Sequence, residues 1–467
     1  MTAVTTPHLD TRHASQAGHR APPPVEAYVL HARCAASLAA AARRVAAVAP
    51  SLSSAELHDL ACQLGRRTSA PGGHRVGIVA ASQQQLAARA SEAAGLVTTV
   101  QPGGLTARPG IFAGNGARGR VALLLPGLGT GQETADERTG GTPPPVFGLT
   151  DPQAVQPAIL HAALSGLRWL GRLGVMANAA AGHSLGEIAA LVWAGCLTET
   201  EAARLAARRS AVINASGLRQ TAMVSVAADT AMSKALCAGT DLVIAAYNGP
   251  QAHVLAGRTK SVREAVRRAE GKGVRAVVLD VSHAFHSPAM ASCVAPLRSV
   301  LADVCFAPPA RRLVSTVTGR VVAAGEDLAS LLCAGLTSPV RFTEALAVAA
   351  AGADLLCEAG PGHALATLAA AGCDVPTVSL EARTADDQGA ARVAAALFAA
   401  GAVHTLAPVL AGRTARPVDI WQDRITLPGP AADVISIGNV RPAWPRGRFL
   451  EDIKLHQQAQ SRSPRAG

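Results

Sequence analysis

The feature that most constrains this chain is a long alternation of strand-like and helix-like segments over residues 121–397. The run Val121–Leu125 is wholly apolar and stops at a Pro-Gly pair, as is typical of a buried strand followed by a turn. Helical periodicity covers 156–173, and a short strand-like segment follows at 178–181. Such alternation predicts an α/β fold with a mostly parallel, α/β-hydrolase-like sheet covered by helices.

A smaller unit is expected inside this alternation. Four strand-like and two helical segments follow one another in the order strand-helix-strand-strand-helix-strand. This order predicts an inserted ferredoxin-like subdomain at about 219–281. Its strands are expected at 222–226, 242–247, 253–256 and 274–279.

Other boundaries follow from composition. Residues 1–24 are rich in His, Thr and Pro and lack an apolar run, so we expect a disordered leader rather than a signal peptide or a membrane span. A small α/β linker domain is expected at 25–105, and a Gly/Pro/Arg-rich connector at 101–120. The main domain should cover 119–400. The Pro/Arg-rich tail, 401–467, is expected to be partly disordered.

The cysteines and the net charge indicate the cellular compartment of the protein and the kind of partner it binds. The nine cysteines are scattered without a CxxC pair, which disfavours a disulfide framework and a zinc site and favours a cytoplasmic location. The net charge of +11 suggests an anionic partner or simply a solubilising surface. Nucleic acid is the weakest candidate, because aromatic residues make up only 3% and no zinc-finger pattern appears.

The segment Gly182–Gly186 has the form G-x-S-x-G, between an expected strand and an expected helix at 187–194. This is the setting of a nucleophile elbow, in which glycines permit a sharp turn and leave room at the hydroxyl. Ser184 is therefore the candidate nucleophile, at the positive end of a helix. We expect His183 beside it to be a packing residue.

A serine needs a general base within hydrogen-bond reach. Two histidines, His283 and His286, stand in one loop directly after the expected subdomain. The residues alone do not choose between them.

Arg209 stands out on its own helix. Thr198 and Glu201 form a capping box that opens the helix, and its periodicity places Arg209 in the apolar stripe. A guanidinium that points inward requires a buried anion, ideally a carboxylate bound by two hydrogen bonds. That anion could be an internal Asp or Glu, or a substrate.

Several motifs together resemble the acyltransferase domains of type I polyketide synthases and malonyl-CoA:acyl-carrier-protein transacylase. The small α/β domain expected at 25–105, with YVLHAR at 28–33, is similar to the linker that joins ketosynthase to acyltransferase in those synthases. The motifs are GHSLGE at 182–187, HAFHSP at 283–288, QPAI at 156–159, STVTGR at 315–320, PVRFTEAL at 339–346 and EAGPGHALATL at 358–368.

The resemblance implies a role for each site residue. His286 would be the base of a Ser-His dyad, and the backbone carbonyl of Ser338 would orient its ring. Backbone N–H groups of Leu128 and Leu185 would form the oxyanion hole. Further positions implied for the substrate are Arg209 for its free carboxylate, and Phe285 and His183 for its pocket.

The resemblance also implies a reaction. Malonyl-CoA would be the substrate, the phosphopantetheine thiol of an acyl carrier protein the acceptor, and no cofactor or metal would be bound. In this family, Leu185 and Phe285 favour malonyl over methylmalonyl, because Phe285 narrows the pocket where a branch methyl would lie. The resemblance also implies ketosynthase or other synthase modules as partners. It implies no binding to nucleic acid or to a membrane.

Two departures from the family keep alternatives open. The first loop reads PGLGTG at 126–131 where the family has PGQGSQ, and residues 132–152 replace a longer helical segment. One alternative is a catalytically degenerate protein that only docks a carrier. Another is an acyl-thioester hydrolase with Asp280 as the third member of a triad. No ketosynthase or carrier motif is found, so the carrier should come from a partner, or the chain is a detached piece of a synthase.

Overall fold

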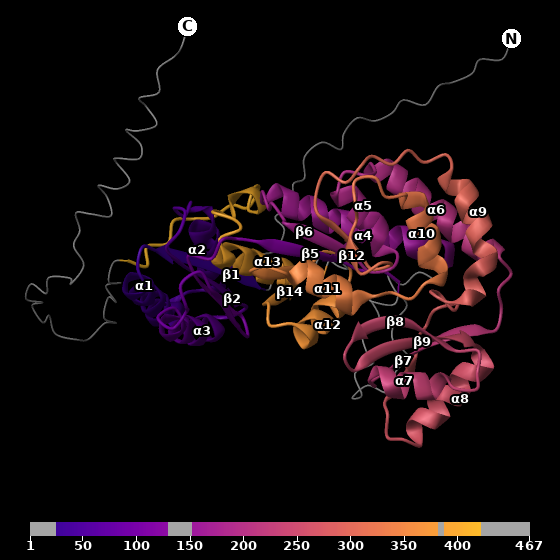
Figure 1. Ribbon diagram of the computed structural model, residues 1–467. Helices are drawn as coiled ribbons and strands as arrows, with labels where there is room; N and C mark the ends of the chain where they lie inside the picture. Colours follow the sequence, from indigo (N-terminus) through magenta and orange to yellow (C-terminus); the bar gives the residue numbers. More distant parts are fainter. Residues whose placement is uncertain (1–24, 129–151, 382–386, 422–467) are drawn as a thin grey trace, which may run out of the picture. The chain divides into compact units, whose positions relative to one another are not determined.

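The computed structural model describes residues 25–128, 152–381 and 387–421, in which three sheets carry the helices (Figure 1). The predicted leader at 1–24, the loop residues 129–131 and the segment 132–151 lie outside the described residues, as does most of the predicted tail. Within the described part, no helix combines the length and apolar character needed to cross a bilayer.

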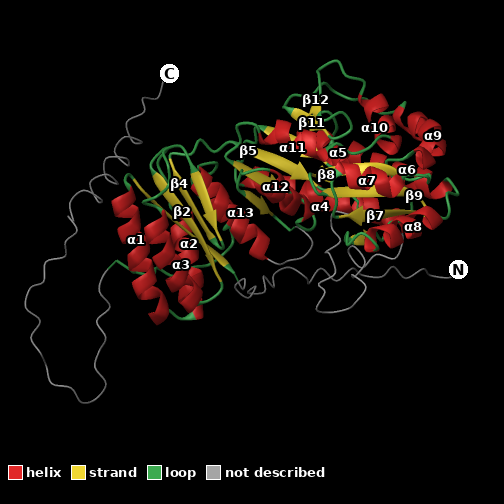
Figure 2. Cartoon of the chain, turned by 60° about the horizontal axis from the view of Figure 1, so that its bottom comes forward, coloured by secondary structure: helices red, strands yellow, loops and turns green. Residues whose placement is uncertain are grey.

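The first sheet is antiparallel, in the order β1-β2-β4-β3 (Figure 2). Alternate residues of its strands face different cores: Tyr28 and Leu30 contact helices of one cluster, whereas Val29 belongs to the main core. Its elements are β1 (Glu26–Ala32), α1 (Ala35–Val48), η1 (Ala49–Ser51), α2 (Ser54–Arg66), β2 (His74–Ala80), α3 (Gln83–Leu96), β3 (Leu105–Arg108) and β4 (Ile111–Asn115).

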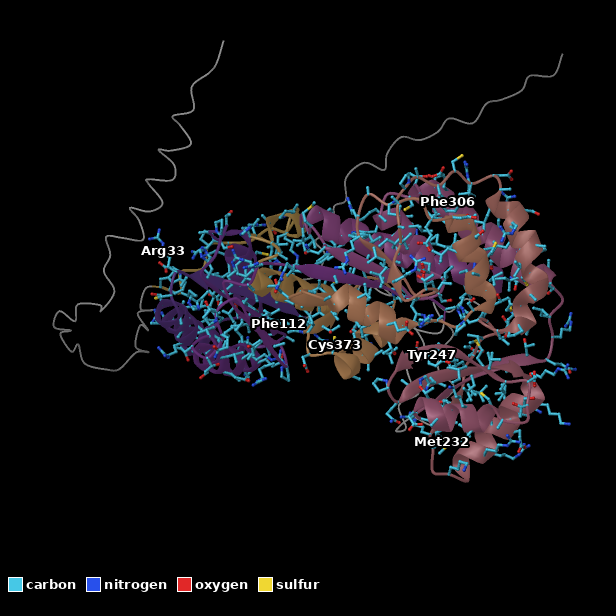
Figure 3. The ribbon with its side chains drawn as sticks, in the orientation of Figure 1. Arg33, Phe112, Met232, Tyr247, Phe306 and Cys373 are labelled. Atoms are coloured by element: carbon cyan, nitrogen blue, oxygen red, sulfur yellow. The ribbon has the colours of Figure 1, made fainter. Side chains whose placement is uncertain are left out.

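The predicted connector at 101–120 is wrong, because β3 and β4 lie within it. Glycines and a proline interrupt these strands in the sequence and hide their short apolar pattern. The structure instead extends the first sheet to Asn115. Phe112 of β4 is buried in the main core, so this strand joins the sheet to the rest of the fold (Figure 3).

The second sheet carries the candidate nucleophile. Its order is β12-β11-β6-β5-β13-β14; the five strands from β11 to β14 run parallel and only β12 is antiparallel. The mostly parallel sheet predicted from the alternation is thus present. Its strands are β5 (Val121–Leu125), β6 (Ala179–Gly182), β11 (Leu313–Ser315), β12 (Arg320–Val321), β13 (Leu355–Glu358) and β14 (Thr377–Ser379).

Helices with strongly apolar faces accompany this sheet. Thr198 caps α6 and shares the predicted capping box with Glu201. The helices are α4 (Pro152–Arg172), α5 (Gly186–Trp193), α6 (Glu199–Ala215), η3 (Pro288–Met290), α9 (Ala291–Leu301), α10 (Leu328–Thr337), α11 (Phe342–Ala350), α12 (Ala364–Gly372), α13 (Asp387–Ala400) and η4 (Ala407–Val409).

The third sheet is antiparallel, in the order β10-β7-β9-β8, and follows the predicted strand-helix-strand-strand-helix-strand sequence. Met232 on α7 packs against its core, and Tyr247 lies on the edge strand β8 (Figure 3). Its elements are β7 (Thr221–Val226), α7 (Thr230–Cys237), β8 (Val243–Gly249), β9 (Ala252–Arg258), α8 (Thr259–Glu270) and β10 (Ala276–Val278).

Val340 connects the third sheet to the segment before α11. Its N–H donates to Ala245 O at 2.8 Å, and its carbonyl accepts from the N–H of Tyr247 at 2.8 Å. This bridge fixes the residues just before Val340, which include Ser338.

Helix α13 packs against β1, β2 and β4 of the first sheet. Two glycines make this contact possible: a Cβ at Gly77 would lie 2.3 Å from Ala395 O, and one at Gly114 would lie 2.0 Å from Ala399 O. The backbone of α13 therefore rests directly on the sheet.

Candidate active site

A sharp turn between β6 and α5 presents Ser184. Its φ of 57° is in the left-handed region, which a non-glycine residue seldom adopts and which is often found at functional sites. The turn is tightly enclosed: a Cβ at Gly186 would lie 2.0 Å from Leu125 O, and one at Gly127 would lie 2.2 Å from His183 O. The sequence thus folds here into the strand-turn-helix geometry that an elbow requires.

His286 lies beside the serine. Its Nε2 is 2.7 Å from Ser184 Oγ, a normal hydrogen-bond distance. The backbone of His286 also has a positive φ, 59°, and its N–H donates to Leu336 O at 2.9 Å. Of the two histidines in this loop, the structure therefore brings His286, and not His283, to the serine.

The His286 ring is held in its neutral form. Burial, together with the nearby His183 and Arg209, lowers its pKa from 6.5 to about 3. The neutral imidazole is the form that can accept a proton from Ser184.

The second ring nitrogen of His286 faces backbone rather than a carboxylate. The backbone of Gly335 and Ser338 favours the protonated ring, although Nδ1 has no hydrogen bond of normal geometry. Asp280 is exposed and does not hydrogen-bond to Nδ1. The site is thus a dyad near the Ser338 backbone, without the triad of the hydrolase alternative.

Arg209 extends from α6 into the same region. It is only 9% exposed, and its Nη1 donates to the side-chain oxygen of Gln156 on α4. Burial lowers its pKa from 12.5 to about 10, so the guanidinium stays positive at neutral pH. Among the described residues no Asp or Glu pairs with it, so the internal carboxylate considered from the sequence is not found there.

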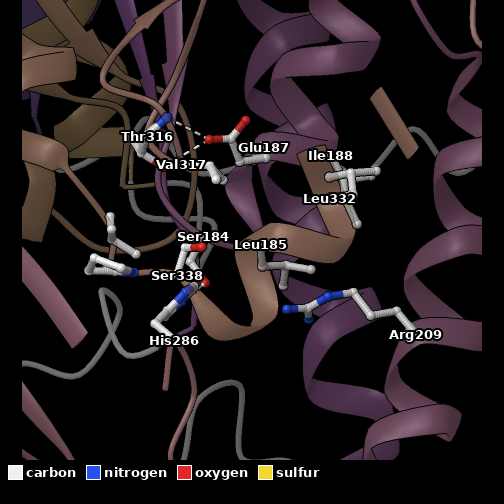
Figure 4. A pocket seen from close by; sticks show the side chains of 13 residues that line it. Ser184, Leu185, Glu187, Ile188, Arg209, His286, Thr316, Val317, Leu332 and Ser338 are labelled. Carbon is white, nitrogen blue, oxygen red and sulfur yellow. Dashed lines mark hydrogen bonds between the residues drawn. The ribbon is translucent and has the colours of Figure 1, made fainter. Parts of the chain in front are cut away.

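These groups line one narrow cleft with about 20 Å³ of free space, in which the guanidinium of Arg209 points toward Leu185 and the Ser184–His286 pair (Figure 4). Its lining residues are Ser184, Leu185, Glu187, Ile188, Arg209, His286, Thr316, Val317, Leu332, Gly335, Ser338, Pro339 and Val340.

The two predicted oxyanion residues flank the elbow. Leu185 is the N-cap of α5, so its N–H lies at the positive end of that helix. Leu128 ends the described part of the loop after β5 and packs against the main core. The contact of Gly127 with the elbow keeps this loop next to Ser184.

Phe285 and His183 are not among the residues that line the cleft. Phe285 is buried between the rings of His283 and His286, with centroids 5.8 and 6.5 Å away. His183 is buried behind the elbow, where its Nε2 is 2.9 Å from Asn248 Oδ1 and its ring meets Phe342 edge-on. The packing expected for His183 is present, because this ring supports the turn.

Sequence reasoning missed three polar residues of the site. Gln156, Glu187 and Thr316 are buried next to the cleft or in it. A signal for Glu187 exists: it is the single charged residue of α5, whose sequence is GEIAALVW. Gln156 and Thr316 lie in the QPAI and STVTGR motifs, but nothing in those motifs names their partners Arg209 and Glu187, which are distant in sequence.

The described residues contain no cluster of His, Cys, Asp or Glu arranged to hold a metal ion. The polar side chains that line the cleft carry three hydroxyls, an imidazole, a guanidinium and one buried carboxyl.

Comparisons with known proteins agree with this geometry. Residues 134–386, more than half of the chain, match the acyl transferase domain family. Polyketide synthase GfsB of Streptomyces halstedii is 37% identical over 220 residues, which are 46% of this chain but 4% of that protein. The chain therefore spans only a small part of such curated relatives.

Solved structures match over a larger share. The acyltransferase domain of an iterative polyketide synthase in enediyne biosynthesis is 38% identical, with a TM-score of 0.73, over 84% of this chain and all of that one. Malonyl-CoA:acyl carrier protein transacylase of Xanthomonas oryzae is 26% identical, with a TM-score of 0.52, over 59% of this chain and 98% of that one. The chain belongs to the acyltransferase domain family of polyketide synthases and malonyl-CoA:acyl carrier protein transacylases.

Proposed function

We propose that this chain moves a malonyl group from malonyl-CoA to the phosphopantetheine thiol of an acyl carrier protein, through a malonyl ester on Ser184. The observation that carries the proposal is the 2.7 Å contact of Ser184 Oγ with His286 Nε2 in a cleft that also holds Arg209. Nucleophile, base and anion-binding group are thus present in one site.

In the first half-reaction, Nε2 of His286 accepts the proton of Ser184 while Oγ attacks the thioester carbonyl carbon. The negative charge that develops on the carbonyl oxygen is stabilised by the backbone N–H groups of Leu185 and Leu128. The carbon–sulfur bond then breaks, and the proton on His286 passes to the sulfur of CoA. A malonyl-seryl ester remains.

The second half-reaction reverses these roles. His286 accepts the proton of the carrier thiol, whose sulfur attacks the ester carbonyl, and the serine oxygen leaves and recovers the proton. No oxidant or cofactor is required, and the only products are CoA and the malonyl-carrier thioester.

Arg209 supports a carboxylated acyl group as substrate. A buried guanidinium with a neutral partner, Gln156, retains donors for a carboxylate, and such charge-assisted pairs are strong. Bound carboxylate would also reduce the positive charge next to His286 and so make the imidazole a stronger base. Leu185 lines the cleft and agrees with malonyl as the unbranched member of this class, whereas Phe285 lies outside the lining.

The relatives suggest the setting. Since the similar proteins include polyketide synthases and malonyl-CoA:acyl carrier protein transacylases, we place the reaction in polyketide or fatty acid biosynthesis. The carrier would be supplied by a partner. We also propose that the reaction takes place in the cytoplasm, which the scattered cysteines without a CxxC pair support.

The test is to incubate the protein with malonyl-CoA and to measure its intact mass. We expect the wild type to gain one malonyl group and Ser184→Ala to gain none, because the ester oxygen is lost. Ser282→Ala, in the loop before His286, is the matched serine control and should be acylated. A folded wild type without an adduct would contradict the proposal and favour the carrier-docking alternative.

A further inference from the structure

Glu187 is a buried acid that the reaction above does not use. It is the second residue of α5, three positions after the nucleophile, and is only 3% exposed. It nevertheless belongs to the residues that line the cleft with Ser184 and Arg209 (Figure 4). A buried carboxyl in a reactive cleft requires a physical explanation.

The contacts of Glu187 connect the two ends of the elbow to strand β11. Its Oε1 lies 2.6 Å from Thr316 N, 2.8 Å from Thr316 Oγ1 and 3.0 Å from Ser315 Oγ. The same Thr316 hydroxyl lies 2.8 Å from Gly182 O, at the end of β6. Glu187 and Thr316 therefore join the strand before Ser184 and the helix after it.

The hydrogen bonds and the burial of Glu187 act on its pKa in opposite directions. The donors on Thr316 and Ser315 favour the ionised carboxyl, whereas burial and the sharing of one proton at Thr316 favour the neutral acid. The Thr316 hydroxyl has one proton but faces two oxygens at 2.8 Å, those of Gly182 and Glu187. If that proton is donated to Gly182 O, a proton on Glu187 can complete the second contact. Burial, the largest influence, also raises the pKa of Glu187 to about 7.

The charged neighbours of Glu187 are few. Strands β5, β6 and β11 contribute no titratable side chain, and the charged residues of α4 face solvent. On α6 only Arg209 is both charged and buried; the elbow and the following loop contribute His183 and His286, and burial lowers the pKa of both. An ionised Glu187 would thus be the one negative side chain among the described residues that line the cleft.

We propose that Glu187 is a positioning residue that holds the nucleophile elbow as a neutral acid, and that its ionisation at alkaline pH weakens capture of an anionic acyl group. An added negative charge in the cleft would disfavour a second anion there and oppose the charge developing at the oxyanion hole. The second part rests on the proposed malonyl transfer; the first part does not.

The main experiment measures the rate of malonyl loading between pH 6.5 and 8.5. A group that titrates near neutrality loses its proton over this pH range, so the wild-type rate should fall about tenfold as pH rises. The rate of Glu187→Gln should change by no more than about twofold, because the amide keeps the contacts and does not ionise. Glu92→Gln, an exposed change on α3, is the matched control and should follow the wild type. Parallel pH profiles of the wild type and Glu187→Gln would overturn the proposal.

A second measurement does not depend on malonyl. A neutral fluorophosphonate probe should label Ser184 at similar rates in the wild type and Glu187→Gln, and at least tenfold more slowly in Glu187→Ala, which loses three hydrogen bonds. Labelling of Glu187→Ala at the wild-type rate would refute the positioning role. Labelling without malonyl loading would refute the proposed substrate alone.

The free energy of unfolding supplies a third test. A carboxyl whose pKa is raised from 4.5 to about 7 keeps its proton in the folded state longer than in the unfolded state, so its contribution to stability falls as pH rises from about 4.5 to 7. Glu358, whose pKa burial raises to about 8, contributes a similar slope in both proteins. Denaturation midpoints of Glu187→Gln should therefore depend less on pH; equal slopes would contradict the neutral acid.

Discussion

At the level of single residues, Arg209 and His286 affect each other through charge as well as through position. The guanidinium lowers the pKa of His286, and a bound carboxylate would reverse part of that effect. Substrate binding and proton transfer are thus linked in the cleft, and a neutral acyl group would lack this link.

The same link predicts how Arg209→Gln should behave. We expect malonyl loading to fall roughly 10- to 100-fold, because a hydrogen bond to a charged group contributes about 1.5–3 kcal/mol. Loading of acetyl from acetyl-CoA should change much less. The measurement is a comparison of loading rates for the two thioesters.

Arg208→Gln is the matched control for that prediction. It removes the neighbouring guanidinium, which is exposed and lies 3.5 Å from Asp303. Its malonyl loading should equal that of the wild type. If Arg209→Gln reduced malonyl and acetyl loading equally, Arg209 would support the fold rather than the carboxylate.

At the level of elements, the contact of α13 with the first sheet depends on missing side chains. Gly114→Ala would place a Cβ 2.0 Å from Ala399 O, so the helix must move away from the sheet. We expect a loss of about 1–3 kcal/mol in the free energy of unfolding, typical of overpacking, measurable as a lower denaturation midpoint.

Gly95→Ala, on α3, is the control for this prediction. A Cβ there meets nothing within 4 Å, and alanine in a helix is favoured over glycine by about 0.5–1 kcal/mol. This variant should be as stable as the wild type or more so. Equal losses in both variants would show that the close contact is not what makes Gly114 necessary.

The elements that could be predicted from the sequence are those whose pattern is local. The elbow at Ser184, the capping box at Thr198 and the four strands of the small sheet each carry their own signal. Strands β3 and β4 could not be recognised, because short strands between glycines gain their stability from pairing with β2 rather than from their own residues. The partner of Arg209 was missed for the same reason, since Gln156 is 53 positions away.

At the level of the whole molecule, residues 402–421 attach the end of the described chain to α2. Gln63 accepts from Val418 N at 2.8 Å and donates to Val418 O at 3.1 Å, and Glu26 accepts from Arg413 at 2.9 Å. Val418 and Ile420 are buried in the core of the first sheet. The sequence did not predict this, because extended segments held by side chains have no periodicity.

A chain that ends at residue 402 should therefore be less stable than one that ends at residue 421. Each buried aliphatic side chain contributes about 1.5–3 kcal/mol. The shorter chain loses five of them together with their hydrogen bonds: Val403, Leu406, Leu410, Val418 and Ile420. Thermal unfolding of the two chains would measure the difference. Equal midpoints would show that these contacts do not stabilise the fold.

The close contacts around the elbow have a consequence for how the gene can vary. Gly127, Gly182 and Gly186 each face backbone atoms at a distance no Cβ can occupy, so even alanine should be excluded. In a library that samples every single-nucleotide change, these codons should tolerate only synonymous substitutions. Codons for Gly72 and Gly103 should tolerate more substitutions. A Cβ at these positions meets nothing within 4 Å, so only the positive φ angle opposes replacement. Among related sequences, the three elbow glycines should then be invariant, whereas residues on the surface should vary.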